Sequence, residues 1–279
     1  MKYLLSIFLF CLTQMIVYGQ TVSIYSINKN GSKGQLTRTE TYQNKQLIEL
    51  NQYEASGELE FTMTKTYNAQ QQLIKEVKSI KKGHEYDLIK EFDYDSKGRK
   101  IYTLFGNNRT GKWSSEGYSY NVNEDVDTIF FYQKNGDLTT IRVFDYTYNK
   151  DDKKVKIIQK NIDLETDEET IESTSIYDYN KQNFDIIISE LDEKGTIIYK
   201  EWITNNADNQ PKIMEYELPD FPKIKKTYYY NTNKKTYKII ESTGDEQTMK
   251  ITFKYNGQGK LIEKKYLTQN NYSGEIYVY

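Results

Sequence analysis

Cysteine is almost missing from this 279-residue chain, since Cys11 is the only one and lies in an apolar N-terminal stretch. The chain also has a single histidine, His84, which follows a glycine and is interpreted as an exposed turn residue. Zinc and copper sites rely on these residue types, so we expect no metal site. Neither a phosphate-binding glycine loop nor a dinucleotide-binding motif occurs, and we therefore expect no cofactor.

An excess of charge of either sign is also missing, because 38 basic residues face 40 acidic ones. Binding to nucleic acid rests on a basic surface, so a nucleic-acid partner is not expected. After the N-terminal stretch, the chain contains no apolar run long enough for a membrane-spanning helix. We therefore expect no membrane span once that stretch is removed.

The N-terminus has the pattern of a signal peptide. Lys2 provides a positive charge, residues 4–17 form a short apolar core, and Val17-Tyr18-Gly19 favours cleavage between Gly19 and Gln20. We predict a signal peptide at 1–19 and one domain at 20–279. The location would be periplasmic, cell-surface or extracellular. The mature chain would have no cysteine, so packing and strand pairing must hold it together without disulfides.

Tyrosine is abundant, with 27 residues. Many belong to a recurring motif, in which an aromatic residue, any residue, Tyr and Asn or Asp precede a polar turn, a basic residue and two apolar residues. The gaps between the motif tyrosines are 25, 27, 26, 28, 31, 51 and 25 residues. The motif tyrosines are Tyr42, Tyr67, Tyr94, Tyr120, Tyr148, Tyr179, Tyr230 and Tyr255.

The motif predicts hairpins. In residues 139–160, Phe144, Tyr146 and Tyr148 alternate with polar residues, a polar turn follows, and an apolar return strand begins. A second turn occurs half a period later in most units. The sequence therefore predicts an all-β fold: an antiparallel meander of two-strand units of about 26 residues, with about 16–20 strands. We expect an elongated or curled single sheet, with the motif tyrosines as packing anchors.

One unit departs from the pattern. In the long gap after Tyr179, Thr204 occupies the expected tyrosine position. All three prolines, Pro211, Pro219 and Pro222, follow closely. Proline cannot donate to a strand ladder, so we expect a bend or a break in the sheet near 205–223.

The motif resembles the YD repeats of the RHS family, most closely in residues 92–101 and 253–262. The resemblance covers roughly residues 36–279 and implies a β-sheet strip. RHS proteins form long shells around a toxin, but this chain is too short for such a shell and has no toxin domain, so that role is not implied. The chain also resembles secreted proteins of Bacteroidota, whose signal peptides often end before Gln.

Carboxylate pairs are the candidates for catalysis, because a glycosidase needs only two acids. With 40 acidic residues, such pairs arise by chance, and we do not expect an enzyme. The acidic stretch 163–169 lacks the spacing of a calcium-binding loop and is interpreted as a solvated hairpin tip. The pairs considered are Asp93 and Asp95, Asp125 and Asp127, Asp151 and Asp152, and Glu168 and Glu169.

Aromatic residues outside the motif are the candidate ligand contacts, and Trp113, beside a turn, is the preferred one. The predicted function is that of an exported, non-enzymatic surface-binding or scaffold module for a protein or glycan partner. Two alternatives are a glycan hydrolase that uses a carboxylate pair and an immunity-like protein that neutralises a toxin through the acidic tip at 163–169. The candidate ligand-binding residues are Trp113, Tyr118, Trp202, Tyr228, Tyr229 and Tyr272.

Overall fold

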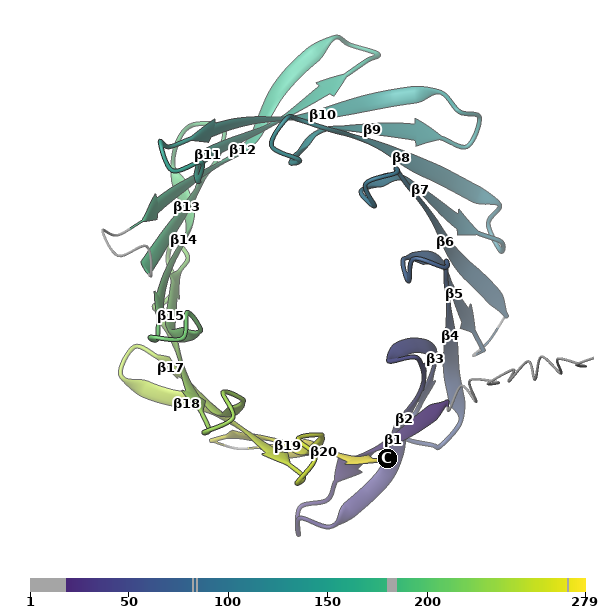
Figure 1. Cartoon of the computed structure of the whole chain (residues 1–279), viewed down its shortest axis with the longest axis vertical. Coiled ribbons are helices and arrows are strands. Elements are labelled where there is room, and N and C mark those ends of the chain that lie inside the picture. Colours follow the sequence, from purple (N-terminus) through teal and green to yellow (C-terminus); the bar gives the residue numbers. More distant parts are fainter. Residues whose placement is uncertain (1–18, 82, 84, 180–184, 270) are drawn as a thin grey trace, which may run out of the picture.

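Twenty β-strands make up the secondary structure of the described part of the chain (Figure 1). The computed structural model describes residues 19–279 except 82, 84, 180–184 and 270. The predicted signal peptide up to residue 18 and His84 lie outside the described residues. The strands are β1 (Gln20–Ile27), β2 (Lys33–Gln43), β3 (Gln46–Tyr53), β4 (Leu59–Tyr67), β5 (Leu73–Ile80), β6 (Tyr86–Tyr94), β7 (Lys100–Asn107), β8 (Lys112–Tyr120), β9 (Val126–Gln133), β10 (Leu138–Tyr148), β11 (Lys154–Asp163), β12 (Glu168–Tyr179), β13 (Asp185–Leu191), β14 (Ile197–Asn205), β15 (Pro211–Glu217), β16 (Ile224–Tyr230), β17 (Thr236–Thr243), β18 (Glu246–Tyr255), β19 (Leu261–Thr268) and β20 (Tyr272–Val278).

The strands form a closed barrel, and the expected open, elongated or curled sheet is wrong. Each strand pairs antiparallel with the next in the chain, and β20 then pairs with β1 from Ser23 opposite Val278 to Ser26 opposite Glu275. Figure 1 shows the resulting ring, in which the two ends of the sheet meet. Lys260 Nζ also lies 3.0 Å from Gln20 Oε1 across this seam. Closure pairs the backbone groups that an open sheet would leave exposed along its edges.

The turns fall into two sets. Those after even-numbered strands use the Asn or Asp that follows the tyrosine: the Asn68 side-chain oxygen accepts the amide of Gln72 at 2.9 Å, and Asp95 accepts that of Arg99 at 2.9 Å. Gln71 and Gly98 supply the positive φ that closes these turns. In Figure 1 this set curls inside the ring, whereas the hairpin tips at the other end extend outside it.

Strand pairing is continuous through residues 205–223, where we expected a bend or break. Thr204 on β14 pairs with Ile213 on β15, and β15 pairs with β16 from Ile213 to Tyr216. The only irregularity between β14 and β15 is a register shift after Thr204. Pro211 is tolerated because it is the first residue of β15, whereas Pro219 and Pro222 lie outside the strands.

The wall is one sheet thick, so the molecule has little deep interior. Among the described residues, the buried apolar side chains are Val22, Ile24 and Ile27, all on β1, and the buried polar ones are Thr103 and Ser115. Most other strand residues are half-buried. Tyrosine suits such a wall, because its ring packs while its hydroxyl reaches water or a backbone acceptor.

Candidate binding site

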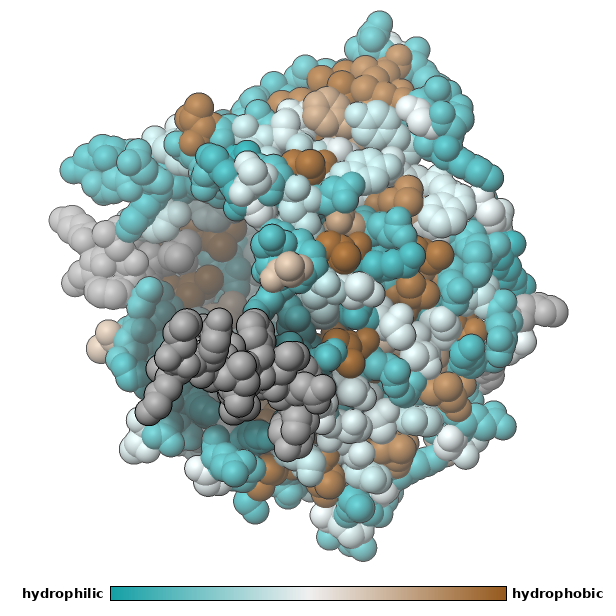
Figure 2. All heavy atoms as spheres, turned by 45° about the vertical axis from the view of Figure 1, so that its right-hand side comes forward, coloured by the Kyte–Doolittle hydropathy of each residue, from teal (hydrophilic) through white to brown (hydrophobic). Residues whose placement is uncertain are grey.

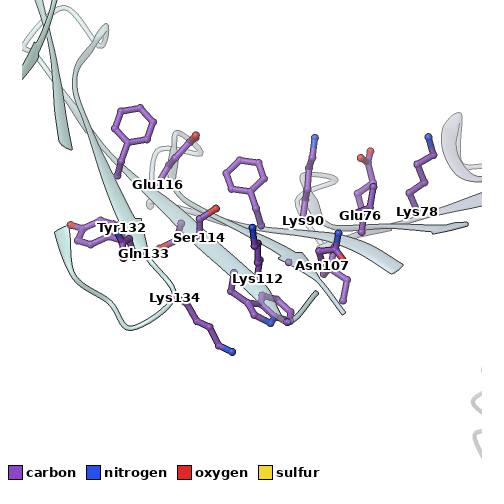
Figure 3. Close-up of a pocket in the computed structure, with 18 of the residues that line it drawn as sticks. Glu76, Lys78, Lys90, Asn107, Lys112, Ser114, Glu116, Tyr132, Gln133 and Lys134 are labelled. Atoms are coloured by element: carbon purple, nitrogen blue, oxygen red, sulfur yellow. The ribbon is translucent and has the colours of Figure 1, made fainter. Parts of the chain in front are cut away.

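The barrel has a lumen face and an outer face, which alternate along every strand. In Figure 3 the side chains of Lys78, Lys90 and Glu116 point toward the concave side of the wall, whereas Lys134 points away from it. The strand register carries this assignment around the ring. Twenty strands spaced about 4.8 Å apart give a ring about 30 Å across, which lumen side chains cannot fill.

The motif tyrosines lie on the lumen face at one mouth of the barrel, and we call them the tyrosine band. A band tyrosine at the end of an even-numbered strand donates its hydroxyl to a backbone carbonyl at the start of the preceding strand, about twenty residues earlier. The bonds run from Tyr67 to Leu47 (2.9 Å), Tyr94 to Leu73 (2.8 Å), Tyr120 to Lys100 (2.5 Å), Tyr179 to Lys154 (3.0 Å), Tyr230 to Pro211 (2.7 Å), Tyr255 to Thr236 (2.9 Å) and Tyr279 to Leu261 (2.7 Å).

Two units vary this arrangement. On β10, Tyr146 makes the backbone bond, to Val126 at 2.7 Å, whereas Tyr148 donates to Asp125 at 2.7 Å. The rings of Tyr146 and Tyr148 stack with centroids 6.0 Å apart. On β2, Tyr42 donates to Glu40 at 2.5 Å. The hydrogen bonds of the band therefore differ between units, and the band is interrupted at the end of β14, where Thr204 stands in place of a tyrosine.

A second tier of tyrosines lies one step deeper on the lumen face. Burial, with help from the neighbouring Glu116, raises the pKa of Tyr118 to about 12, and burial raises that of Tyr146 to about 12. Burial and the Glu275 carboxylate likewise raise the pKa of Tyr277. Burial also raises the pKa of Tyr228. These phenols are therefore neutral at physiological pH and act as hydrogen-bond donors and apolar surfaces.

The six predicted contact residues do not converge on one site. Tyr118 and Tyr228 lie on the lumen face of β8 and β16, where Tyr118 hydrogen-bonds to Glu116 and lies 3.3 Å from the Thr103 hydroxyl. The other four lie on the outer face, at β8, β14, β16 and β20: Trp113, Trp202, Tyr229 and Tyr272.

The outer-face aromatics have basic neighbours. Trp202 has the ammonium groups of Lys223 and Lys200 at 4.2 Å and 5.1 Å from its ring centroid. Tyr229 has the ammonium group of Lys238 at 3.8 Å. Trp113 instead covers Gly106, because a Cβ atom built on that glycine would lie 2.2 Å from the indole ring. These aromatics are held by local packing and cation–π contacts rather than by a shared cavity.

Several of the carboxylates considered for catalysis are engaged in hydrogen bonds or ion pairs. Asp95 accepts the amide and side chain of Arg99, and these bonds lower its pKa. Asp125 is held by Lys154 and Tyr148, and Asp127 accepts the Ser119 hydroxyl. The described residues contain no cluster of three or more His, Cys, Asp or Glu side chains placed to hold a metal ion. Over the same residues, no helix is long and apolar enough to cross a membrane.

A hollow of about 1050 Å³ lies against β5–β9 near the other mouth (Figure 3), and Trp113 is the one predicted contact residue among its lining residues. Its lining includes Lys78, Leu88, Lys90, Phe105 and Lys112. These five residues were not predicted, because they occupy ordinary alternating strand positions and carry no motif. Only the register between neighbouring strands brings them together.

Comparisons with known proteins find only distant similarities. No protein-family model and no curated protein matches the sequence. Among solved structures, a porin-like protein from Bacteroides uniformis is 12% identical with a TM-score of 0.37, covering 93% of this chain and 97% of that one. A second porin-like protein, from Bacteroides vulgatus, is 10% identical with a TM-score of 0.25, covering 94% and 98%.

The TcdB2-TccC3 structure is 10% identical with a TM-score of 0.33, over 87% of this chain and 17% of that one. This chain therefore spans about a sixth of TcdB2-TccC3. At such identities and TM-scores, these likenesses carry no argument about the fold or the function of this chain. The resemblance to YD repeats stays an interpretation of the sequence.

Proposed function

We propose that this chain is an exported, non-enzymatic binding or scaffold module that holds a protein or glycan partner against the tyrosine band of its lumen. The observation that supports this most is the band itself. Tyrosine rings line one mouth of a closed wall, and the second tier places further neutral phenols, Tyr118, Tyr146 and Tyr228, one step deeper.

Such a surface suits recognition. Tyrosine offers a large ring and a hydrogen-bonding tip with few rotatable bonds, so a partner is bound at low entropic cost. Many of these rings are already fixed by hydrogen bonds to the wall, as for Tyr94 and Tyr230. The apolar faces of sugars and the side chains of an extended peptide both pack against rings held in this way.

The ionisation of the carboxylates favours binding over glycan hydrolysis. A glycosidase needs one carboxylic acid whose pKa is raised so that it holds a proton. In the described part of the chain, all carboxylates with a resolved shift have lowered pKa values: Asp95, Glu124, Asp125, Asp192 and Glu215.

The outer face favours a barrel whose wall meets water on both sides. A transmembrane barrel presents an outward apolar band, in which charged residues are costly. Here the outer face carries ion pairs on strands around the ring, such as Lys75 with Glu91 at 2.8 Å and Lys265 with Glu263 at 3.0 Å. Figure 2 shows apolar atoms scattered among hydrophilic ones over one side of the molecule rather than gathered in a belt.

Adjacent tyrosines on β16 test the proposal, because Tyr228 faces the lumen and Tyr229 faces outward. The protein would first be screened on glycan and peptide arrays, and the affinity for a retained partner would then be measured for Tyr228→Leu and Tyr229→Leu. We expect Tyr228→Leu to weaken binding at least tenfold and Tyr229→Leu to change it less than twofold. The reverse order, or turnover of a polysaccharide, would overturn the proposal.

A further inference from the structure

We propose that the hollow against β5–β9 is a binding site for an amphipathic organic anion, whose apolar body packs on Leu88 and Phe105 while its anionic head meets Lys78, Lys90 and Lys112. This inference goes beyond the proposed macromolecular partner, because the site lies toward the opposite mouth from the tyrosine band.

The register builds a compact patch with an apolar centre. One row across four strands reads Lys78, Leu88, Asn107 and Lys112, from β5 to β8. The next row on the lumen face reads Glu76, Lys90, Phe105 and Ser114. Leu88 therefore has Lys78 beside it on β5 and Lys90 two residues along its own strand, and Phe105 has Lys90 beside it on β6. Neighbouring strands lie about 4.8 Å apart, so the patch spans about 14 Å, the scale of a medium-chain amphiphile.

The lysines of the patch are available to an anion. Within the described residues, Lys78, Lys90 and Lys112 have no carboxylate at salt-bridge distance, unlike Lys65, which lies 3.1 Å from Glu76. Lys78 and Lys90 instead rest over phenylalanine rings, with Nζ 3.9 Å from the Phe61 centroid and 5.8 Å from the Phe105 centroid. Cation–π contacts orient the ammonium groups and leave donors for a carboxylate.

The acids nearby are already engaged. Glu76 is held by Lys65, and Glu116 accepts the hydroxyl of Tyr118. On the lumen face, the three lysines Lys78, Lys90 and Lys112 outnumber Glu76 and Glu116 among the lining residues, so the hollow has a net positive charge. On the far side of the ring, at β13 and β14, Glu190 and Glu201 surround Tyr199 and help burial to raise its pKa to about 12 (Figure 1).

The apolar centre favours an amphiphile over an anionic polysaccharide. Leu88 is 36% exposed, and a large apolar residue exposed among unpaired cations gains stability when an alkyl chain covers it. A sugar ring packs best on a flat aromatic ring, whereas Leu88 offers an aliphatic surface and the ring of Phe105 already has the Lys90 ammonium group 5.8 Å from its centroid. The chemical class that matches the patch is a carboxylate with an apolar body.

Titration calorimetry with dodecanoate below its micelle concentration tests the site. The double variant Lys78→Gln and Lys90→Gln removes two lumen charges, and Lys156→Gln with Lys254→Gln removes two exposed outer-face charges as the matched control. We expect the wild-type chain and the control to bind dodecanoate within twofold of each other, and the lumen variant to bind at least tenfold more weakly. Dodecyltrimethylammonium should bind no variant.

Four results would overturn the site: no binding of dodecanoate by the wild-type chain, equal binding by the lumen variant, equal binding of the cationic amphiphile, and binding of oligouronate in place of dodecanoate. Circular dichroism of each variant identifies loss of folding. If the lumen variant is unfolded, Leu88→Ser replaces it, with the expectation that dodecanoate loses at least fivefold in affinity; unchanged affinity would overturn the site. Failure here leaves the array experiment on Tyr228 and Tyr229 unaffected, so the two proposals fail separately.

Discussion

The hydroxyl of Tyr94 at the end of β6 donates a 2.8 Å hydrogen bond to the carbonyl oxygen of Leu73 at the start of β5. The bond crosses the hairpin at the open ends of its strands, opposite the connecting turn. Related bonds recur around one mouth of the barrel, so the tyrosine band ties most of the hairpins closed while its rings line the lumen.

Removing the Tyr94 hydroxyl should therefore destabilise the barrel modestly. We expect Tyr94→Phe to lower the free energy of unfolding by about 1 kcal/mol, because a backbone carbonyl loses one neutral hydrogen bond. Urea unfolding followed by circular dichroism measures the change. The matched control is Tyr102→Phe, on the outer face of β7; an equal loss in both variants would contradict the role of the Tyr94 hydroxyl.

Removing a whole ring from the band should lower the free energy of unfolding more than removing an outer ring. Tyr148 stacks on Tyr146 and donates to Asp125, whereas Tyr272 begins the last strand at the rim. We expect Tyr148→Ala to lower the free energy of unfolding by about 2–3 kcal/mol more than Tyr272→Ala. Similar thermal midpoints for the two variants would contradict the conclusion that rings of the band stabilise the barrel more than outer rings do.

Ionisation of the buried tyrosines should lower the stability of the barrel at alkaline pH. Burial raises the pKa of Tyr118, Tyr146 and Tyr199 to about 12, above the ordinary value of 10.0. A raised folded-state pKa contributes stability that is complete below pH 10 and is lost as the pH rises from about 10 to 12. Tyrosinate absorbance should therefore appear at higher pH in the native chain than in urea. Coincident titration curves would exclude buried phenols.

The contact between Gly106 and Trp113 can be probed by adding one methyl group. A Cβ atom at residue 106 would lie 2.2–2.5 Å from the indole ring, so Gly106→Ala must displace Trp113. We expect a loss of about 1–3 kcal/mol in unfolding free energy and a shift in tryptophan emission. Gly257→Ala is the control, because nothing lies within 4 Å of its Cβ position. An unchanged emission spectrum in Gly106→Ala would contradict the packing.

The local structure could be read from the sequence because it depends on neighbouring residues. Alternation of Phe144, Tyr146 and Tyr148 gives a strand, and Asn149 then begins the turn by accepting the amide of Lys153 at 3.0 Å. Closure could not be read in this way. It depends on pairing between Ser23 and Val278, which are separated by nearly the whole chain and carry no motif.

The candidate sites also depend on contacts between residues far apart in the chain, which the sequence does not reveal. Trp113 and Trp202 are prominent in the sequence, yet the structure places them on separate strands of the outer face. Lys78, Leu88 and Phe105 are unremarkable in sequence, and only the register of β5, β6 and β7 makes them neighbours. Strand pairing continues where three prolines had predicted a bend or a break, because Pro211 begins a strand and the other two lie between β15 and β16.

Cross-linking β1 to β20 tests the closed barrel most directly, since a lumen exists only if the two strands pair. Ser23→Cys and Val278→Cys would be introduced together with Cys11→Ser, and Ser23→Cys with Thr128→Cys is the control pair on distant strands. Paired residues on neighbouring strands lie within disulfide reach. The account predicts that mild oxidation gives an intramolecular disulfide between residues 23 and 278, seen by mass spectrometry, and none in the control. Free thiols or only intermolecular disulfides in the Ser23 and Val278 variant would show that the barrel is open.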